Sequence, residues 1–191
     1  MRSVFGIGET ILDIIFKEGQ PYKAVPGGSV FNGLISLGRL QVPVTFISEL
    51  GKDQVGDLIL RFMEQNHIST RYIDRFPDGK SPISLAFLDA NRNANYSFYK
   101  DYPTERLDVP FPRIEADDIL IIGSYYALNP ALRPRMVEFL QYACERKAII
   151  YYDLNFRKAH AHEAIRLMPT VLENLEYADI VRGSDEDFLN L

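Results

Sequence analysis

The sequence has very little cysteine and no long apolar run. Cys144 is the only cysteine among 191 residues, which excludes an internal disulfide and a cysteine-rich zinc site. It falls within a helical pattern, where we expect it to pack as a small side chain rather than to act as a nucleophile. No apolar segment is long enough to cross a bilayer, and Glu9 and Asp13 follow residues 1–8 too soon for a secretory signal. These absences predict a soluble, cytoplasmic protein.

The chain also lacks the bias toward glycine, proline or charge that keeps proteins disordered. With 47% hydrophobic residues, it is expected to form a single domain with a substantial core. Its net charge of -5 provides no general attraction to nucleic acid or to an anionic membrane. A bound nucleotide would therefore depend on local donors, such as helix N-termini, backbone amides and arginines.

Short strand-like runs alternate with longer helical runs, which is the order of a sheet with helices packed across it. The expected strands are 4–8, 44–48, 118–124, 148–153 and 179–182, and the expected helices are 29–40, 54–66, 131–146 and 160–176. Ser29 and Asp53 stand where they would cap the first two helices. Strands such as ILIIG and AIIYY have little polar alternation, which is typical of a parallel sheet covered on both faces. The pattern therefore predicts an α/β fold.

Residues 70–100 depart from this pattern. They contain alternating segments, ISLAFLD (83–89) and NYSFYK (95–100), around a polar turn. Such segments are typical of β-hairpins. We expect them to form a small β lid beside the main sheet.

The end of the chain resembles the start of a helix. Ser184 and Asp187 have the spacing of a capping box, but the sequence stops at Leu191, and isolated helices this short are marginal. We therefore expect the chain to be truncated or the sequence to be incomplete.

The polar residues near the N-terminus suggest a site for a polyhydroxylated ligand. The strand that ends in GETILD brings Asp13 toward the carboxyl end of the sheet, where ligands of open α/β folds bind. Its carboxylate can accept hydrogen bonds from two adjacent hydroxyls. In GGSVFN, Gly27 and Gly28 let a ligand approach the backbone, and the amide of Asn32 offers a donor and acceptors. Taken alone, however, paired glycines before a helix are more often an ordinary turn.

The order of six segments makes the comparison specific. They are GETILD, the GG to Asn32 segment, LGKDQVG (50–56), FYK (98–100), DLNFR (153–157) and SDEDF (184–188). Together they resemble the PfkB (ribokinase-like) family of carbohydrate kinases, and fructokinases most of all. The resemblance extends over essentially the whole chain. It implies a ribokinase-like three-layer α/β/α sandwich, with a central mostly parallel sheet and a small β lid built from about residues 10–25 and 70–100. Residues 1–191 would be the N-terminal part of a single kinase domain whose C-terminal part is missing.

The resemblance also implies the function and the residues that serve it. The expected reaction is ATP-dependent phosphorylation of a sugar hydroxyl, with ATP and Mg²⁺ as cofactors and fructose as the first candidate substrate. The residues implied to bind the substrate are Asp13, Gly27, Gly28, Asn32, Phe98, Asn155 and Arg157. Phe98 would cover the sugar ring from the lid, and Arg157 would lie near the sugar or the transferring phosphate, where its forked guanidinium can hold an anion. Ser184 is implied to contact the nucleotide.

Two departures from the family pattern affect the expected chemistry. Ser184 and Asp187 replace the Asn and Glu of the NxxE segment, which is associated with magnesium, so the implied metal residue is the shorter Asp187. No glycine-rich GAGD-like string occurs, although the family takes its catalytic base from one. We therefore assign no base and expect it beyond Leu191, and we expect the chain alone to be inactive because phosphoryl transfer requires that group.

Other function classes fit the sequence less well. A dinucleotide-binding dehydrogenase is disfavoured because Ile11 stands where the third glycine of the fingerprint should be, and a P-loop enzyme is disfavoured because no GxxxxGK[ST] occurs. A sugar-binding sensor or inactive kinase homologue would use the same contacts and need no base, so this alternative stays open. The unpaired edges of the predicted lid also make a homodimer through the lid an expectation.

Overall fold

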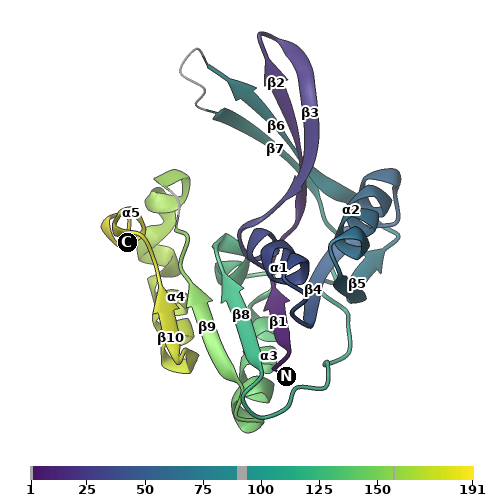
Figure 1. The fold of residues 1–191 in the computed structure, drawn as a ribbon. Helices are drawn as coiled ribbons and strands as arrows, with labels where there is room; N and C mark the ends of the chain where they lie inside the picture. Colours follow the sequence, from purple (N-terminus) through teal and green to yellow (C-terminus); the bar gives the residue numbers. More distant parts are fainter. Residues whose placement is uncertain (1, 90–93, 157) are drawn as a thin grey trace.

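The chain is described from a computed structural model that covers residues 2–89, 94–156 and 158–191. It contains a main sheet with helices on both faces and a smaller sheet that stands above one edge of it (Figure 1).

The main sheet has six strands, and every neighbouring pair is parallel. In spatial order they are β10 (Ile180–Arg182), β9 (Ile149–Asp153), β8 (Ile119–Gly123), β1 (Val4–Ile7), β4 (Val44–Gly51) and β5 (Ile68–Phe76). Residues of β1 are buried throughout, as expected for a strand at the centre of a sheet that is covered on both faces.

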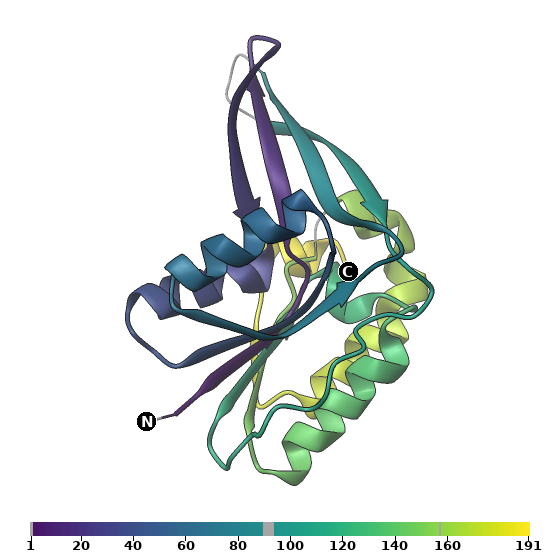
Figure 2. The same ribbon diagram turned by 90° about the vertical axis from the view of Figure 1, so that its right-hand side faces the viewer.

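Helices cover the two faces of this sheet, so that the molecule has three layers (Figure 2). One face carries α1 (Ser29–Arg39) and α2 (Gln54–Gln65), and the other carries α3 (Arg133–Glu145) and α4 (Ala164–Tyr177). Short helical segments are η1 (Tyr125–Leu128), η2 (Lys158–Glu163) and α5 (Asp185–Leu189). Each face has its own hydrophobic core: Phe31 and Met63 lie in one, and Phe139 and Leu167 lie in the other. The predicted α/β/α sandwich with a parallel central sheet is confirmed.

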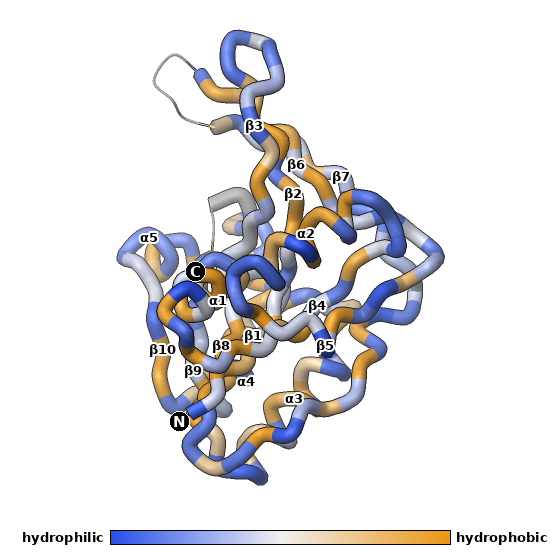
Figure 3. The backbone as a smooth tube through the Cα atoms, turned by 45° about the vertical axis from the view of Figure 1, so that its right-hand side comes forward, coloured by the Kyte–Doolittle hydropathy of each residue, from blue (hydrophilic) through white to orange (hydrophobic). Residues whose placement is uncertain are grey.

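The smaller sheet, which we call the lid, has four strands. They are ordered β3 (Gln20–Gly27), β2 (Ile11–Lys17), β6 (Lys80–Leu88) and β7 (Ala94–Asp101). The lid begins directly after β1, so it stands above the carboxyl ends of the parallel strands (Figure 1). Hydrophobic stretches in β2 and β6 (Figure 3) join it to the body, where Leu12 packs in the core beneath α1 and α2.

Two expectations from the sequence are corrected by the fold. Residues 70–76 are part of β5, which pairs with β4 in the main sheet and not with the lid. This strand lies at the edge of the sheet, and buried residues alternate along it with partly or fully exposed ones. Its sequence therefore alternates between apolar and polar residues, as a lid hairpin would. Cys144 does not pack as a small core residue but lies exposed on α3.

Among the residues that the structure describes, no helix combines the length and the apolarity that a membrane-spanning segment needs.

Candidate functional site

Two of the residues singled out in the sequence lie at the carboxyl ends of parallel strands. Asn155 follows β9 and Ser184 follows β10, while the GETILD segment leads from β1 into the lid. Because the carboxyl ends of parallel strands meet at one edge, this edge is where open α/β folds bind ligands. The lid stands above it (Figure 1).

Asp13 lies in the lid, in a row of residues that crosses all four of its strands. The strand register places Val25, Asp13, Ser84 and Phe98 opposite one another. Residues that pair directly across a sheet point to the same face. The carboxylate of Asp13 and the ring of Phe98 therefore share one face of the lid, with Ser84 between them.

The carboxylate of Asp13 lies between Ser84 and Gly27. The hydroxyl of Ser84 donates a hydrogen bond to Asp13 Oδ1, and a Cβ placed on Gly27 would lie only 2.7 Å from Asp13 Oδ2. A side chain at position 27 would therefore displace the Asp13 carboxylate. The pKa of Asp13 is raised above its ordinary value, because the effect of burial outweighs the lowering by the hydrogen bond from Ser84.

Gly28 is the N-cap of α1, and its backbone has a conformation that only glycine adopts readily. Its φ is 142°, and a Cβ there would lie 2.3 Å from the carbonyl oxygen of Glu9. The predicted cap, Ser29, is instead the first helical residue and makes no capping hydrogen bond. Its hydroxyl donates to Asp153 Oδ2 at 3.5 Å. The close approach of Glu9 explains the difference, because it fixes the helix start at Gly28.

Asn32 lies one helical turn beyond Gly28. Its backbone N–H donates to the carbonyl of Gly28 at 2.9 Å, and its side chain is exposed. The structure thus brings Asp13 against Gly27 and joins Gly28 to Asn32 through the first turn of α1. None of the described contacts joins the side chains of Asp13 and Asn32 directly.

Phe98 belongs to an exposed aromatic group on the lid. Its ring stacks on that of Tyr96 with 5.8 Å between centroids, and 59% of its surface is exposed. The ammonium of Lys100 lies 5.6 Å from the centre of the Phe98 ring. Exposed aromatic rings offer the flat apolar surface on which an apolar sugar face can stack.

A chain of polar contacts ties this aromatic strand to the body. Lys100 Nζ donates to Glu9 Oε1 at 2.7 Å and to Oε2 at 2.9 Å, and the hydroxyl of Tyr102 donates to Glu9 Oε1 at 2.8 Å. Glu9 belongs to the loop between β1 and β2. It therefore holds β7 close to the start of the lid.

The sequence reasoning gave no role to Ser84, Tyr96, Lys100 or Glu9. The available signals were Glu9 beside Gly8 in the GETILD segment, and a serine at an inward position of the alternating ISLAFLD strand. Neither signal identifies its partner, because Ser84 and Asp13 are 71 positions apart in the chain.

The remaining predicted residues follow β9 and β10. Asn155 has a positive φ of 39°, a backbone conformation in which asparagine is enriched. Arg157 lies outside the described residues. Ser184 and Asp187 form the predicted capping box: Asp187 Oδ2 accepts from the backbone N–H of Ser184 at 2.7 Å, and Ser184 Oγ accepts from that of Asp187 at 3.2 Å.

The capping box involves Asp187, the residue expected to serve Mg²⁺. Among the described residues no group of three or more His, Cys, Asp or Glu side chains could hold a metal ion, so they form no all-protein cage. Mg²⁺ bound with a nucleotide keeps several waters and needs only one or two carboxylates besides the phosphates. Asp187 uses only Oδ2 in the capping box, which is compatible with such a role.

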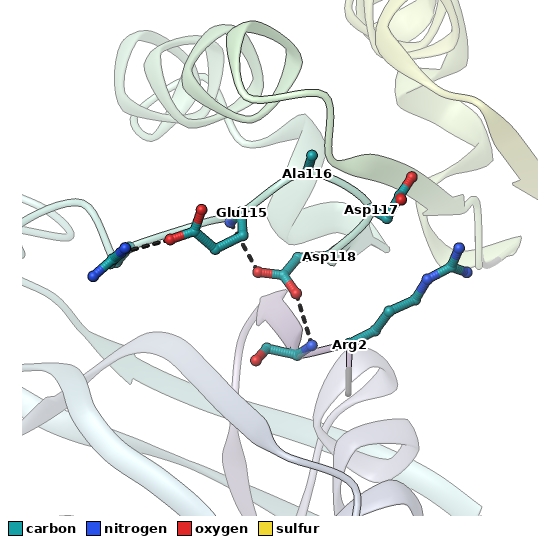
Figure 4. Close-up of a pocket in the computed structure, with 7 residues that line it drawn as sticks. Arg2, Glu115, Ala116, Asp117 and Asp118 are labelled. Carbon is teal, nitrogen blue, oxygen red and sulfur yellow. Dashed lines mark hydrogen bonds and ion pairs between the residues drawn. The ribbon is translucent and has the colours of Figure 1, made fainter.

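A cavity at the opposite end of the strands is explained by the fold itself. It is lined by residues that precede β1 and β8, including Arg2 and Asp118 (Figure 4). The carboxylate of Asp118 accepts the backbone N–H groups of Ser3 and Glu115, at 2.8 and 2.9 Å. Asp118 therefore anchors the turn before β8 and is not part of the candidate site.

Comparisons with known proteins agree with this geometry. A putative sugar kinase from Pyrococcus horikoshii is 27% identical over all of this chain and 66% of its own length. A crystal structure of a sugar kinase from the same organism in complex with ATP superposes with a TM-score of 0.80 at 24% identity, and the match covers 97% of this chain and 64% of that one.

A fructokinase double mutant from Vibrio cholerae O395, solved with fructose, ADP and a potassium ion, gives a TM-score of 0.81 at 22% identity. That match covers 98% of this chain and 61% of the fructokinase. These structures show that the fold is ribokinase-like. The chain spans between 51% and 66% of the length of the curated relatives it matches.

A family model described as the pfkB family carbohydrate kinase matches residues 1–191. The whole described chain, with its parallel sheet and its lid, thus falls within one match, and the chain belongs to the PfkB family of carbohydrate kinases.

Proposed function

We propose that this chain binds a sugar between the lid and the carboxyl edge of the main sheet, as part of a kinase that transfers a phosphoryl group from ATP to a sugar hydroxyl. Residues 1–191 are the N-terminal part of its single kinase domain. The observation that carries the proposal is the arrangement of Asp13, which lies against Gly27 and shares a lid face with Phe98.

The proposed contacts follow from the chemistry of the side chains. The carboxylate of Asp13 accepts hydrogen bonds from sugar hydroxyls, and the amide of Asn32 both donates and accepts. Gly27 and Gly28 let the sugar approach the backbone, while Phe98 covers the ring. Asn155, which follows β9, and Arg157 serve the sugar or the transferring phosphate.

The nucleotide is proposed to bind nearer the end of the chain. Ser184 contacts it, and Asp187 holds Mg²⁺ through the water shell of the ion. Bound Mg²⁺ would neutralise the charge of the phosphates during transfer. The base that removes the proton of the sugar hydroxyl is proposed to lie beyond Leu191.

Fructose is the first candidate substrate. It is supported by the resemblance of the DLNFR segment and the lid to those of fructokinases, and by the fructokinase that was solved with fructose and ADP. The competing substrates are 2-keto-3-deoxygluconate, ribose and a nucleoside. We also propose a cytoplasmic location and a homodimer formed through the lid, where the outer strands β3 and β7 offer unpaired backbone groups.

ATP consumption by the full-length protein with a panel of these sugars tests the reaction. The expected result is Mg²⁺-dependent turnover that is highest with fructose. Calorimetric titration with sugar and with ATP separates a kinase from a sensor, because a sensor binds sugar with no effect of nucleotide. Sugar binding without any turnover would overturn the kinase proposal, whereas turnover with another sugar would overturn only the choice of fructose.

A further inference from the structure

The hydroxyl of Ser84 is a buried polar group in contact with the proposed sugar-binding carboxylate. Ser84 lies on β6 and has no exposed surface, with a relative accessibility of 0%. Its Oγ donates to Asp13 Oδ1 from the neighbouring strand of the lid. A buried hydroxyl without a partner destabilises a protein, so this bond satisfies Ser84 as well as Asp13.

The two oxygens of Asp13 have different surroundings. Oδ1 accepts from Ser84, and Oδ2 lies beside Gly27. Each carboxylate oxygen has further acceptor capacity. With one oxygen tethered, the other is held toward the glycines and the start of α1.

We propose that Ser84 is a positioning residue that holds the Asp13 carboxylate in its sugar-binding orientation. This inference rests on the proposed function, because it gives Ser84 a purpose only if Asp13 binds the substrate. Ser84 acts through Asp13 and does not itself touch the sugar.

The row of residues across the lid supports a role beyond local packing. Ser84 stands between Asp13 and Phe98 on one face, and both neighbours are proposed to contact the sugar. A larger residue there would displace one of them. An alanine would fit the space but leave the half-buried carboxylate without its hydroxyl donor.

Other charges near Asp13 do not provide the same support. The other charged residues of the lid strands and of the loop before β2 are Glu9, Lys17, Lys23, Lys80, Lys100 and Asp101. Lys100 is bound by Glu9. The pKa of Asp13 is raised by burial and lowered by the hydrogen bond from Ser84, and not by these charges.

The test compares Ser84→Ala with Ser81→Ala in the full-length protein. Ser81 is a buried serine on the same strand, but its hydroxyl donates to the carbonyl of Gly51 at 3.4 Å and not to Asp13. Calorimetry measures sugar affinity and ATP affinity for both variants. We expect Ser84→Ala to weaken sugar binding about tenfold, as for a hydrogen bond to a charged group, with ATP affinity unchanged. Ser81→Ala should bind sugar as the wild type does.

A pH profile distinguishes positioning from packing. The charged form of Asp13 binds the sugar, so affinity falls as the pH drops through its pKa. Because Ser84 lowers that pKa, its removal moves the acid limb of sugar affinity to higher pH. Ser84→Cys keeps a donor of nearly the same shape but weakens it, so a smaller shift in the same direction is expected. If the alanine variant does not fold, the cysteine variant carries the same comparison.

The outcomes separate this inference from the proposed function. If Asp13→Asn abolishes sugar binding while both Ser84 variants keep the affinity and the acid limb of the wild type, the positioning role is wrong and the proposed site stands. If Asp13→Asn binds sugar like the wild type, the proposed function of the site is wrong, and Ser84 loses its role with it.

Discussion

At the scale of single residues, the glycine that caps α1 and the glycine within its first turns have opposite structural demands. Gly28 has a φ of 142°, and its Cβ position is blocked by the carbonyl of Glu9. Gly33 lies within the helix with nothing within 4 Å of its Cβ position. Glycine is therefore required at one position and is only an entropic cost at the other.

Substitution of each glycine by alanine tests this contrast. Gly28→Ala is expected to lower the free energy of unfolding by about 2 kcal/mol or more, because it adds backbone strain and a clash. Gly33→Ala is expected to raise it by about 0.5–1 kcal/mol, since alanine is the better helix former. Urea unfolding of both variants measures the two values. Equal effects would contradict the requirement for glycine at position 28.

A buried ion pair joins β4 to the segment that follows the lid. Glu49 is 1% exposed and accepts from Arg106 Nε at 2.9 Å, from the backbone of Leu107 at 3.1 Å and from the Tyr126 hydroxyl at 3.2 Å. Arg106 also lies 3.8 Å from the centre of the Tyr102 ring. The pair sits in a network that leaves Glu49 well supplied with donors.

Loss of Arg106 should therefore destabilise the fold. Arg106→Ala is expected to lower the free energy of unfolding by about 3–5 kcal/mol, because it leaves a buried carboxylate unpaired. The matched control is Arg113→Ala, which removes an exposed pair with Glu115 and should change stability by less than about 1 kcal/mol. Thermal or urea unfolding compares them, and similar values for the two variants would argue against a structural role for the buried pair.

At the scale of elements, Asp53 links a helix of the body to a strand of the lid. Its Oδ1 accepts the backbone N–H of Gly56 in the first turn of α2 at 2.8 Å, and its Oδ2 accepts that of Ser81 on β6 at 2.7 Å. Burial raises the pKa of Asp53, but these hydrogen bonds outweigh burial and leave the pKa below its ordinary value. The ionised form is thus the one that the fold favours.

This arrangement makes the effect of Asp53 depend on pH. Asp53→Ala is expected to lower the free energy of unfolding by about 1–2 kcal/mol at neutral pH, as for loss of an N-cap. Because the pKa of Asp53 is lower in the folded state, its charge stabilises the fold above the pKa of the unfolded state, and this stabilisation is lost as the pH falls. The difference in the free energy of unfolding between the variant and the wild type should therefore shrink below about pH 4. Glu64→Ala, on the exposed side of the same helix, serves as the control. A difference in the free energy of unfolding that stays constant with pH would show that the charge of Asp53 does not stabilise the fold.

Local sequence signals predicted the elements that local chemistry determines. The cap at Asp53 and the capping box of Ser184 and Asp187 follow from spacing alone, and both are present. The start of α1 and the membership of β5 were not predictable in this way, because the first depends on a contact with Glu9 and the second on pairing with β4. The same reason hides Ser84, whose partner lies far away in the chain.

At the scale of the whole molecule, the lid and the body are joined at several points around the candidate site. The chain crosses between them at both ends of the β2 and β3 hairpin and again before β6 and after β7. The contacts of Asp53 with Ser81 and of Glu9 with Lys100 reinforce these crossings. The lid is therefore fixed at its base, above the edge of the sheet to which Asn155 and Ser184 also belong.

The most direct test of the account is a crystal structure of the full-length protein with the sugar that it binds most tightly. The account predicts that hydroxyls of the sugar lie within hydrogen-bonding distance of both Asp13 and Asn32, with the ring beneath Phe98. A sugar bound elsewhere, with the Asp13 carboxylate and the Asn32 amide out of its reach, would contradict it.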